Sequence, residues 1–222
     1  MKVYFLVAPL IMISAVIALG QQTPVATDEE PHHHVLFRNE SVVVIRATLQ
    51  SGESTLYHTH SHDSAGFEFV ASTTTEQLFG KPEGPAETSH PGEVSADSVN
   101  EPTTHRVHNV GNGRMDVFHV ELLRRPTQPS VRAAAPIAVE NASARVYNWI
   151  LAPGAAATMH THQRPYLIVA ATPMHLKMTA PDGRALSEEL KPGDFHWIDA
   201  KVTHALANEG TVEAQIVEIE LK

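Results

Sequence analysis

Two pairs of histidines in this chain have the residue type and spacing of metal ligands. His58 and His60 form one His-Thr-His sequence, and His160 and His162 form a second one 102 residues later. Because side chains two residues apart on a β-strand point to the same face, each pair would present two imidazoles together. The chain has no cysteine, so any transition metal must be bound by histidine, carboxylate or water. The spacing therefore predicts two metal sites.

A third histidine follows each pair at a similar distance. His105 and His204 each begin a His-x-x-x-Asn-x-Gly sequence, and they lie 99 residues apart. Each would complete a set of three nitrogen ligands and leave positions open to water or substrate. The alternative is that these histidines are polar core residues satisfied by hydrogen bonds. That explanation suits any single histidine better than it suits a trio that occurs twice.

The elements that position these histidines also occur twice. A Pro-Gly-acidic turn precedes each third histidine, and each copy ends in a similar apolar and acidic run, at 117–123 and 216–221. Each copy consists of short runs rich in Val, Ile and aromatic residues, such as 41–49 and 145–151, separated by turn residues. Helical periodicity is hard to find. The pattern predicts an all-β protein of two sandwiches or barrels.

The expected segments follow from composition along the chain. Residues 1–20 contain a lysine, an apolar run and small residues at the end, which is typical of a signal peptide and predicts export to the periplasm or the medium. Residues 21–31 are polar and predict a flexible leader. The repeats and a Pro-containing segment between them predict an N-terminal unit, a linker and a C-terminal unit, at 32–125, 126–141 and 142–222.

Charge and composition exclude some partners. The formal net charge is −9, and the acidic residues are spread along the chain, whereas binding to nucleic acid or to anionic membranes needs a basic face. We therefore expect no nucleic-acid partner and no stable membrane association after signal cleavage. A small-molecule ligand is the expected partner, and the sequence leaves open whether the chain forms a homo-oligomer.

The motifs described above resemble the two signature motifs of the cupin superfamily. The resemblance rests on Gly-x5-His-x-His, the Pro-Gly-acidic turn and His-x-x-x-Asn, and it covers residues 35–123 and 142–222. It implies a two-domain cupin, or bicupin, made of two tandem jelly-roll β-barrels with a metal inside each. It also implies that Asn109 and Asn208 lie behind the ligands or close a strand. Barrels of this size suit one small ligand.

Both copies depart from the cupin pattern at the glutamate that usually follows His-x-His. Tyr166 occupies this position in the second copy, where it could be an acid, a hydrogen-bond donor to substrate or a packing residue. In the first copy, direct counting places Ser64 there, whereas anchoring on the following apolar residues places Phe67 there. We expect three-histidine sites, with one alternative in the first copy, a compensating ligand from Glu68, Asp63 or His62.

The remaining histidines lack partners in the repeat. We expect structural or surface roles for five of them, His62, His108, His119, His175 and His196, and we exclude the run His32, His33 and His34 from the site.

Two classes of function fit these features. One is an exported metal-dependent oxidoreductase of dioxygenase type that uses open metal positions, and the other is a non-catalytic protein of the cell envelope that binds a metal or small ligand. The donor set does not distinguish Zn, Fe, Cu, Ni or Mn. Export weighs slightly against Fe(II), which is harder to keep reduced outside the cytoplasm.

Overall fold

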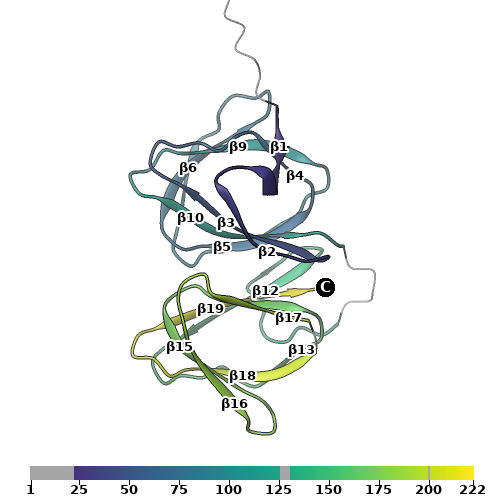
Figure 1. Cartoon of the computed structure of the whole chain (residues 1–222), viewed down its shortest axis with the longest axis vertical. Helices are drawn as coiled ribbons and strands as arrows, with labels where there is room; N and C mark the ends of the chain where they lie inside the picture. The colour runs from purple at the N-terminus through teal and green to yellow at the C-terminus, as the bar shows by residue number, and fades with distance from the viewer. Residues whose placement is uncertain (1–22, 126–130, 200) are drawn as a thin grey trace, which may run out of the picture.

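The computed structural model describes residues 23–125, 131–199 and 201–222. The expected signal peptide and the first residues of the expected linker lie outside these ranges. Within them the chain is all-β apart from one short 3-10 helix, Thr27–Glu29. No helix in the described part of the chain has the length and hydrophobicity needed to cross a membrane. The strands form two units, one above the other in Figure 1.

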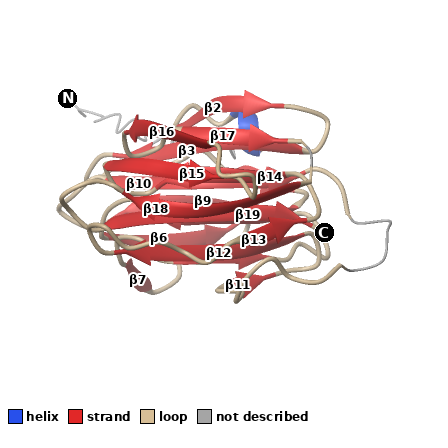
Figure 2. Ribbon diagram, turned by 90° about the horizontal axis from the view of Figure 1, so that it is seen from below, coloured by secondary structure: helices blue, strands red, loops and turns tan. Residues whose placement is uncertain are grey.

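The first unit is built from two five-stranded sheets, with the orders β1-β4-β9-β6-β7 and β2-β3-β10-β5-β8. In Figure 2 the strands of both units run across the view, roughly side by side, and the sheets overlap one another. The strands of the first sheet are β1 Val25–Ala26, β4 His58–His60, β9 Thr103–Asn109, β6 Ser72–Leu78 and β7 Ala86–Ser89. Those of the second are β2 His33–Arg38, β3 Val42–Leu49, β10 Met115–Leu122, β5 Asp63–Glu68 and β8 Val94–Asp97.

The second unit repeats this arrangement with a five-stranded and a four-stranded sheet. Their orders are β11-β12-β19-β14-β17 and β13-β18-β15-β16. The first contains β11 Val139–Glu140, β12 Ala144–Leu151, β19 Ala214–Leu221, β14 Tyr166–Ala170 and β17 Phe195–Ile198. The second contains β13 His160–His162, β18 Val202–Asn208, β15 Met174–Thr179 and β16 Ala185–Leu190. This two-sheet topology confirms the predicted all-β fold of two jelly-roll units.

Strand register shows which residues of the two units are equivalent. His58 pairs with His105 across β4 and β9, and His160 pairs with His204 across β13 and β18. Ser64 pairs with Glu121, just as Tyr166 pairs with Glu220. Ser64 is therefore the counterpart of Tyr166, as direct counting predicted, and the alternative pairing of Phe67 with Tyr166 is wrong.

The two units share one hydrophobic core. Alternate residues of β3, β5 and β10 pack against alternate residues of β12, β14 and β19, so that the five-stranded sheets face each other. Buried polar groups also join the units. The Ser143 hydroxyl donates to the Asp63 carboxylate at 2.6 Å, and the Asn141 amide donates to the carbonyls of Ser64 and Asp97. These contacts hold the units together as one body.

The segment predicted to be a flexible leader is ordered from residue 23 onward, which corrects that prediction. Val25–Ala26 pairs in parallel with His58–Thr59, and the buried carboxylate of Glu30 accepts hydrogen bonds from the Leu56 and His32 amides. A polar composition suggested disorder, but a sheet edge supplies backbone partners whatever the side chains are. The Val139–Glu140 pair, assigned by sequence to the linker, joins the second unit by pairing with β12.

Candidate metal centres

The second unit brings its three predicted ligands together in its interior. His160 and His162 point to the same side of β13, as the spacing predicted, and β18 places His204 beside His160 with 3.0 Å between their Nε2 atoms. The three histidines are 6%, 0% and 3% exposed, in the order His160, His162 and His204. The sequence therefore identified this trio correctly as neighbours in space.

A fourth donor, Glu218 on β19, joins this trio and was missed by the sequence reasoning. Its carboxylate lies 3.3 Å from His160 Nε2, 3.2 Å from His162 Nε2 and 3.1 Å from His204 Nε2, and it is fully buried. The Trp149 indole N–H donates to the same carboxylate at 2.7 Å. The predicted three-histidine set is thus a group of three histidines and one glutamate in this unit.

The donor atoms of this group suit a bound cation. His162 Nε2 and Glu218 Oε1 are buried and have no hydrogen-bond partner among the described residues, although they lie only 3.2 Å apart. His160 Nδ1 lies 2.8 Å from the Thr158 carbonyl, a contact that directs Nε2 to the centre. Burial opposes the charge of His162, but Glu218 and Glu220 outweigh it and raise its pKa to about 9. A metal cation would replace that proton.

Tyr166 packs against the second centre. Its ring is fully buried and stacks on His162, with 3.9 Å between ring centroids and 17° between planes. Its hydroxyl has no hydrogen-bond partner among the described residues. Burial, with the charges of Glu218 and Glu220, raises the pKa of Tyr166 above its usual value, so the phenol stays protonated. Of the three roles considered, packing fits this environment best.

The first unit gathers the other predicted trio. The Nε2 atoms of His58 and His105 lie 3.1 Å apart. The centroid of the His60 ring lies 5.0 Å from the ring centroid of His58 and 4.9 Å from that of His105. Each Nδ1 has its own partner, the Leu56 carbonyl for His58, Glu121 for His60 and Glu76 for His105. These contacts leave Nε2 as the ligand atom of each ring, so the trio also suits a cation.

His119 and Glu121 lie next to this cluster, and His119 is partly buried rather than on the surface. Both lie on β10, and one oxygen of Glu121 is 2.7 Å from His60 Nδ1 and 2.9 Å from His119 Nε2. Burial alone would raise the pKa of Glu121, but the hydrogen bonds from His119 and His60 lower it to about 2. His60, His119 and Glu121 form a further group of clustered donor atoms.

A pocket of about 450 Å³ opens onto the histidines of the first unit. Five histidines line it, namely His33, His58, His60, His105 and His119, together with polar residues such as Ser64, Glu68, Thr74 and Asp97 and apolar ones such as Val107, Met115 and Val117. His33, which the sequence reasoning excluded, lies with its ring 4.7 Å from that of His58. It begins β2 and pairs with Ala47 of β3, another residue of the pocket wall.

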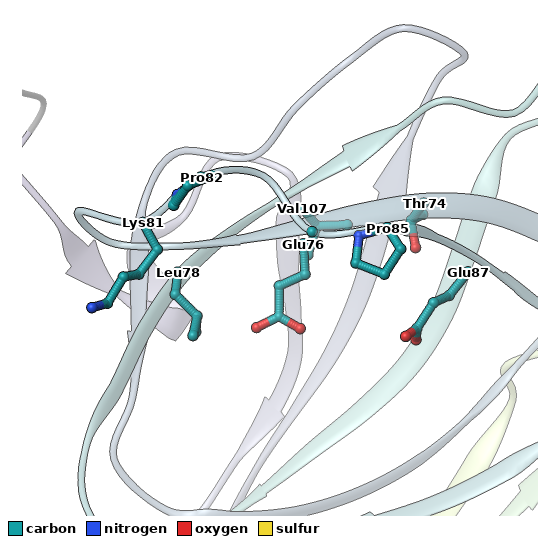
Figure 3. Close-up of a pocket in the computed structure, with 9 residues that line it drawn as sticks. Thr74, Glu76, Leu78, Lys81, Pro82, Pro85, Glu87 and Val107 are labelled. Atoms are coloured by element: carbon teal, nitrogen blue, oxygen red, sulfur yellow. The ribbon is translucent and has the colours of Figure 1, made fainter.

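A neighbouring pocket of about 350 Å³ shares Thr74, Glu76 and Val107 with this one. Figure 3 shows its lining, where the carboxylates of Glu76 and Glu87 and the ammonium group of Lys81 project from the ribbon. Glu76 therefore faces solvent on one side while its carboxylate holds His105 on the other.

Side-chain size explains why the first unit is open and the second is filled. The strand registers match Ala47 to Trp149, Ser64 to Tyr166, Thr74 to Leu176 and Glu76 to Met178. In the second unit these large side chains belong to a hydrophobic cluster around the donors. In the first unit their smaller or polar counterparts line the pocket. The equivalent cluster of the first unit has only three buried members.

The two motif asparagines close strands in both units. The Asn109 amide donates to the Leu49 and Gly113 carbonyls, and the Asn208 amide donates to the Leu151 and Val212 carbonyls. Of the two roles that the motif implied, closing a strand is the one that these contacts fill.

The three residues considered as compensating ligands lie apart from the donor groups found in the described residues. Asp63 is buried at the junction of the units, where Ser143 and the Val99 amide bind it. Glu68 lines the pocket wall, and burial raises its pKa to about 7. His62 lines a separate pocket.

Three other histidines contact glutamates away from the centres, as the sequence suggested for surface positions. His108 contacts Glu83, His196 contacts Glu188, and His175 contacts Glu189 and Glu209.

Comparison with known proteins identifies a relative and the fold. No family model matches the chain. The beta-alanine degradation protein BauB of Pseudomonas aeruginosa is 32% identical over 91 residues, which cover 41% of this chain and 95% of that protein. The aligned length corresponds to one of the two units.

Solved structures share the whole two-unit arrangement at low sequence identity. AerE from Microcystis aeruginosa is 12% identical with a TM-score of 0.61, and the match covers 91% of this chain and 99% of AerE. A cupin 2 conserved barrel protein from Leptotrichia buccalis is 12% identical with a TM-score of 0.53, covering 90% and 92%. Oxalate decarboxylase from Bacillus subtilis, which has Mn(II) centres, is 12% identical with a TM-score of 0.52, covering 82% and 69%. The chain belongs to the same family as BauB, and it has the fold of these cupin structures.

Proposed function

We propose that this chain is an exported metal-dependent oxidoreductase whose first unit acts on a small polar molecule. The observation that carries the proposal is the pocket of about 450 Å³ that opens onto His58, His60 and His105. These side chains are a little exposed, with 17% for His60 and 16% for His105. A ligand could therefore reach the Nε2 side of the trio, as catalytic metal sites require.

The residues of the first unit would have separate roles in binding the metal and the ligand. A divalent metal bound there would supply Lewis acidity, or activation of O2, at its open positions. His58, His60 and His105 would hold it through Nε2. Glu121 and Glu76 accept hydrogen bonds from the Nδ1 atoms of His60 and His105 and so fix these rings in place. Ser64, Thr74 and other polar residues of the mixed pocket wall would bind the ligand. Glu68 could hold or release a proton near neutral pH because burial raises its pKa to about 7.

The second unit would hold a metal that substrates do not reach. Its four donors are between 0% and 6% exposed, and Tyr166, Trp149 and other large side chains fill the space around them. A carboxylate in the donor set offsets part of the charge of the cation. We propose a stabilising role for this metal.

The relatives agree with a small polar substrate without identifying it. BauB is named for the degradation of beta-alanine, and oxalate decarboxylase for the conversion of oxalate. Both molecules would fit within a pocket of this size.

Blocking the pocket tests this proposal. The metal-loaded chain is screened with small carboxylic and amino acids for a rise in melting temperature, and the molecules that bind are tested for O2 uptake or product formation. We expect both responses in the wild type and in His108→Ala, which alters a partly exposed histidine outside the pocket lining, and we expect neither in Ser64→Tyr or His105→Ala. Responses that persist in both pocket variants would refute the assignment to the first unit.

A second candidate is a non-catalytic protein of the cell envelope that binds a metal or a small ligand. The buried second centre favours it, because that site offers a cation enclosure without access for substrate. Binding without turnover under every metal tested would support this candidate over the enzyme. Export is tested separately, by sequencing the N-terminus of protein recovered from the periplasm or the medium, which should begin near residue 21.

A further inference from the structure

Two residues occupy the same position in the two units but differ in chemistry. His119 pairs with Ile45 across β10 and β3, and Glu218 pairs with Tyr147 across β19 and β12. Ile45 and Tyr147 are themselves equivalent, since the matching strands start at Val42 and Ala144. His119 is therefore the counterpart of Glu218, and the same alternation of the strand turns both side chains toward the histidine cluster.

In the second unit this position supplies a donor to the centre. The Glu218 carboxylate lies within 3.3 Å of the Nε2 atoms of all three histidines. In the first unit His119 lies on the wall of the pocket that contains His58, His60 and His105, and its ring centroid is 5.3 Å from that of His60. Its side chain is 19% exposed. Its position thus places it at the edge of the cluster rather than on the outer surface.

Glu121 currently holds His119 beside the centre. One Glu121 oxygen accepts from both His60 Nδ1 and His119 Nε2, at 2.7 Å and 2.9 Å. Its counterpart in the second unit, Glu220, lies 3.6 Å from His162 Nδ1 and binds the Tyr147 hydroxyl. Both glutamates therefore lie beside the outer nitrogen of the second histidine of the His-x-His pair, but only Glu121 is within hydrogen-bond distance of it. The contact of Glu121 with His60 Nδ1 does not require His119, so His119 can leave Glu121 and bind elsewhere.

We propose that His119 is a fourth protein ligand of the metal in the first unit, in the place that Glu218 takes in the second. Rotation of its side chain would release Nε2 from Glu121, and a ring nitrogen of His119 would then help to hold the cation. The first centre would then have four neutral nitrogen donors, and the second would have three nitrogens and a carboxylate. The inference rests on the proposed metal site of the first unit.

The two donor sets should select different metals. Nitrogen donors suit Cu(II), Ni(II) and Zn(II), whereas a carboxylate improves binding of Mn(II). The full-length chain should therefore bind Cu(II) more tightly at the first unit and Mn(II) more tightly at the second. Four nitrogens around Cu(II) also give a characteristic hyperfine pattern in electron paramagnetic resonance.

The test compares variants of the full-length, metal-free chain titrated with Cu(II) and Mn(II). His119→Ala should weaken Cu(II) binding at one site by roughly 10- to 100-fold, at least the loss typical of removing an outer partner of a ligand. The spectrum should lose one nitrogen coupling. His119→Glu should restore a fourth donor and shift that site toward Mn(II). Glu218→Gln should weaken the other site, and His108→Ala should change neither.

Three results would overturn the inference. If Cu(II) affinity and the nitrogen couplings are unchanged in His119→Ala, His119 is not a ligand, although the site itself stands. If His119→Ala weakens binding but His119→Glu does not restore it, His119 acts through Glu121 instead. If His58→Ala leaves the metal stoichiometry of the chain unchanged, the first unit has no metal site, and the proposed function fails together with this inference.

Discussion

Replacing Tyr166 tests whether this residue fills the second unit or takes part in chemistry. The ring is fully buried, it stacks on His162, and its hydroxyl is without a hydrogen-bond partner in the described part of the chain. Tyr166→Ser would delete the ring and leave a cavity beside the donors. Tyr166→Phe would delete only the unpaired hydroxyl. The two variants therefore separate packing from any function of the phenol.

The expected magnitudes differ widely. Truncating a buried aromatic residue costs about 3–5 kcal/mol, and in a chain of 150–250 residues each kcal/mol lowers the melting temperature by about 2–4 °C. Tyr166→Ser should thus lower it by roughly 6–20 °C. Tyr166→Phe should stay within about 1 kcal/mol of the wild type or stabilise the chain, because a buried polar group without a partner is removed.

Unfolding of the metal-free chain in urea and by heat, followed by circular dichroism, measures both effects. Metal uptake by Tyr166→Phe should match that of the wild type. If this variant loses more than about 2 kcal/mol, or fails to bind metal, the hydroxyl has a partner and the packing interpretation is wrong.

Two further predictions concern the pH dependence of metal binding and the junction of the units. His162 has a pKa raised to about 9, so it is protonated in the metal-free chain at pH 7.5, whereas the pKa of His58 is lowered to about 2 by burial and neighbouring histidines. The raised pKa stabilises the metal-free fold fully below pH 6.5, and this contribution is lost as pH rises through 9. Zinc binding at pH 7.5 should therefore release about one proton, from the second unit, and calorimetry in buffers of different ionisation enthalpy that detects no release would contradict this. Ser143→Ala should lower the unfolding free energy by about 1–3 kcal/mol, because it removes a donor from the buried Asp63 carboxylate; a cost no larger than that of the exposed control Ser61→Ala would contradict it.

The repeated motifs allowed the fold and the two histidine trios to be predicted from sequence. The two-residue period of a strand places His160 and His162 on one face whatever surrounds them, and the matching spacing to His204 indicated which distant strand would meet them. These are local rules of backbone geometry, so they hold without knowledge of the packing.

The fourth donor and the pocket could not be predicted in the same way. The two copies differ at this position, where Glu218 matches His119, so comparing the copies did not reveal a common fourth ligand. The alternation of side chains along β19 was a signal that could have indicated Glu218. The pocket depends on the volumes of side chains from several strands, such as Ser64 against Tyr166 and Ala47 against Trp149. His33 reaches it because β2 pairs with β3, which sets His33 opposite Ala47 on the pocket wall.

The central claim is that the chain has two unequal metal sites, one open and one closed. Release of zinc from the fully loaded chain into an excess of a coloured chelator tests it most directly. We predict two phases of equal size, a fast one that is lost in His105→Ala and a slow one that is lost in His204→Ala. A single phase, or the loss of both phases in either variant, would contradict the account.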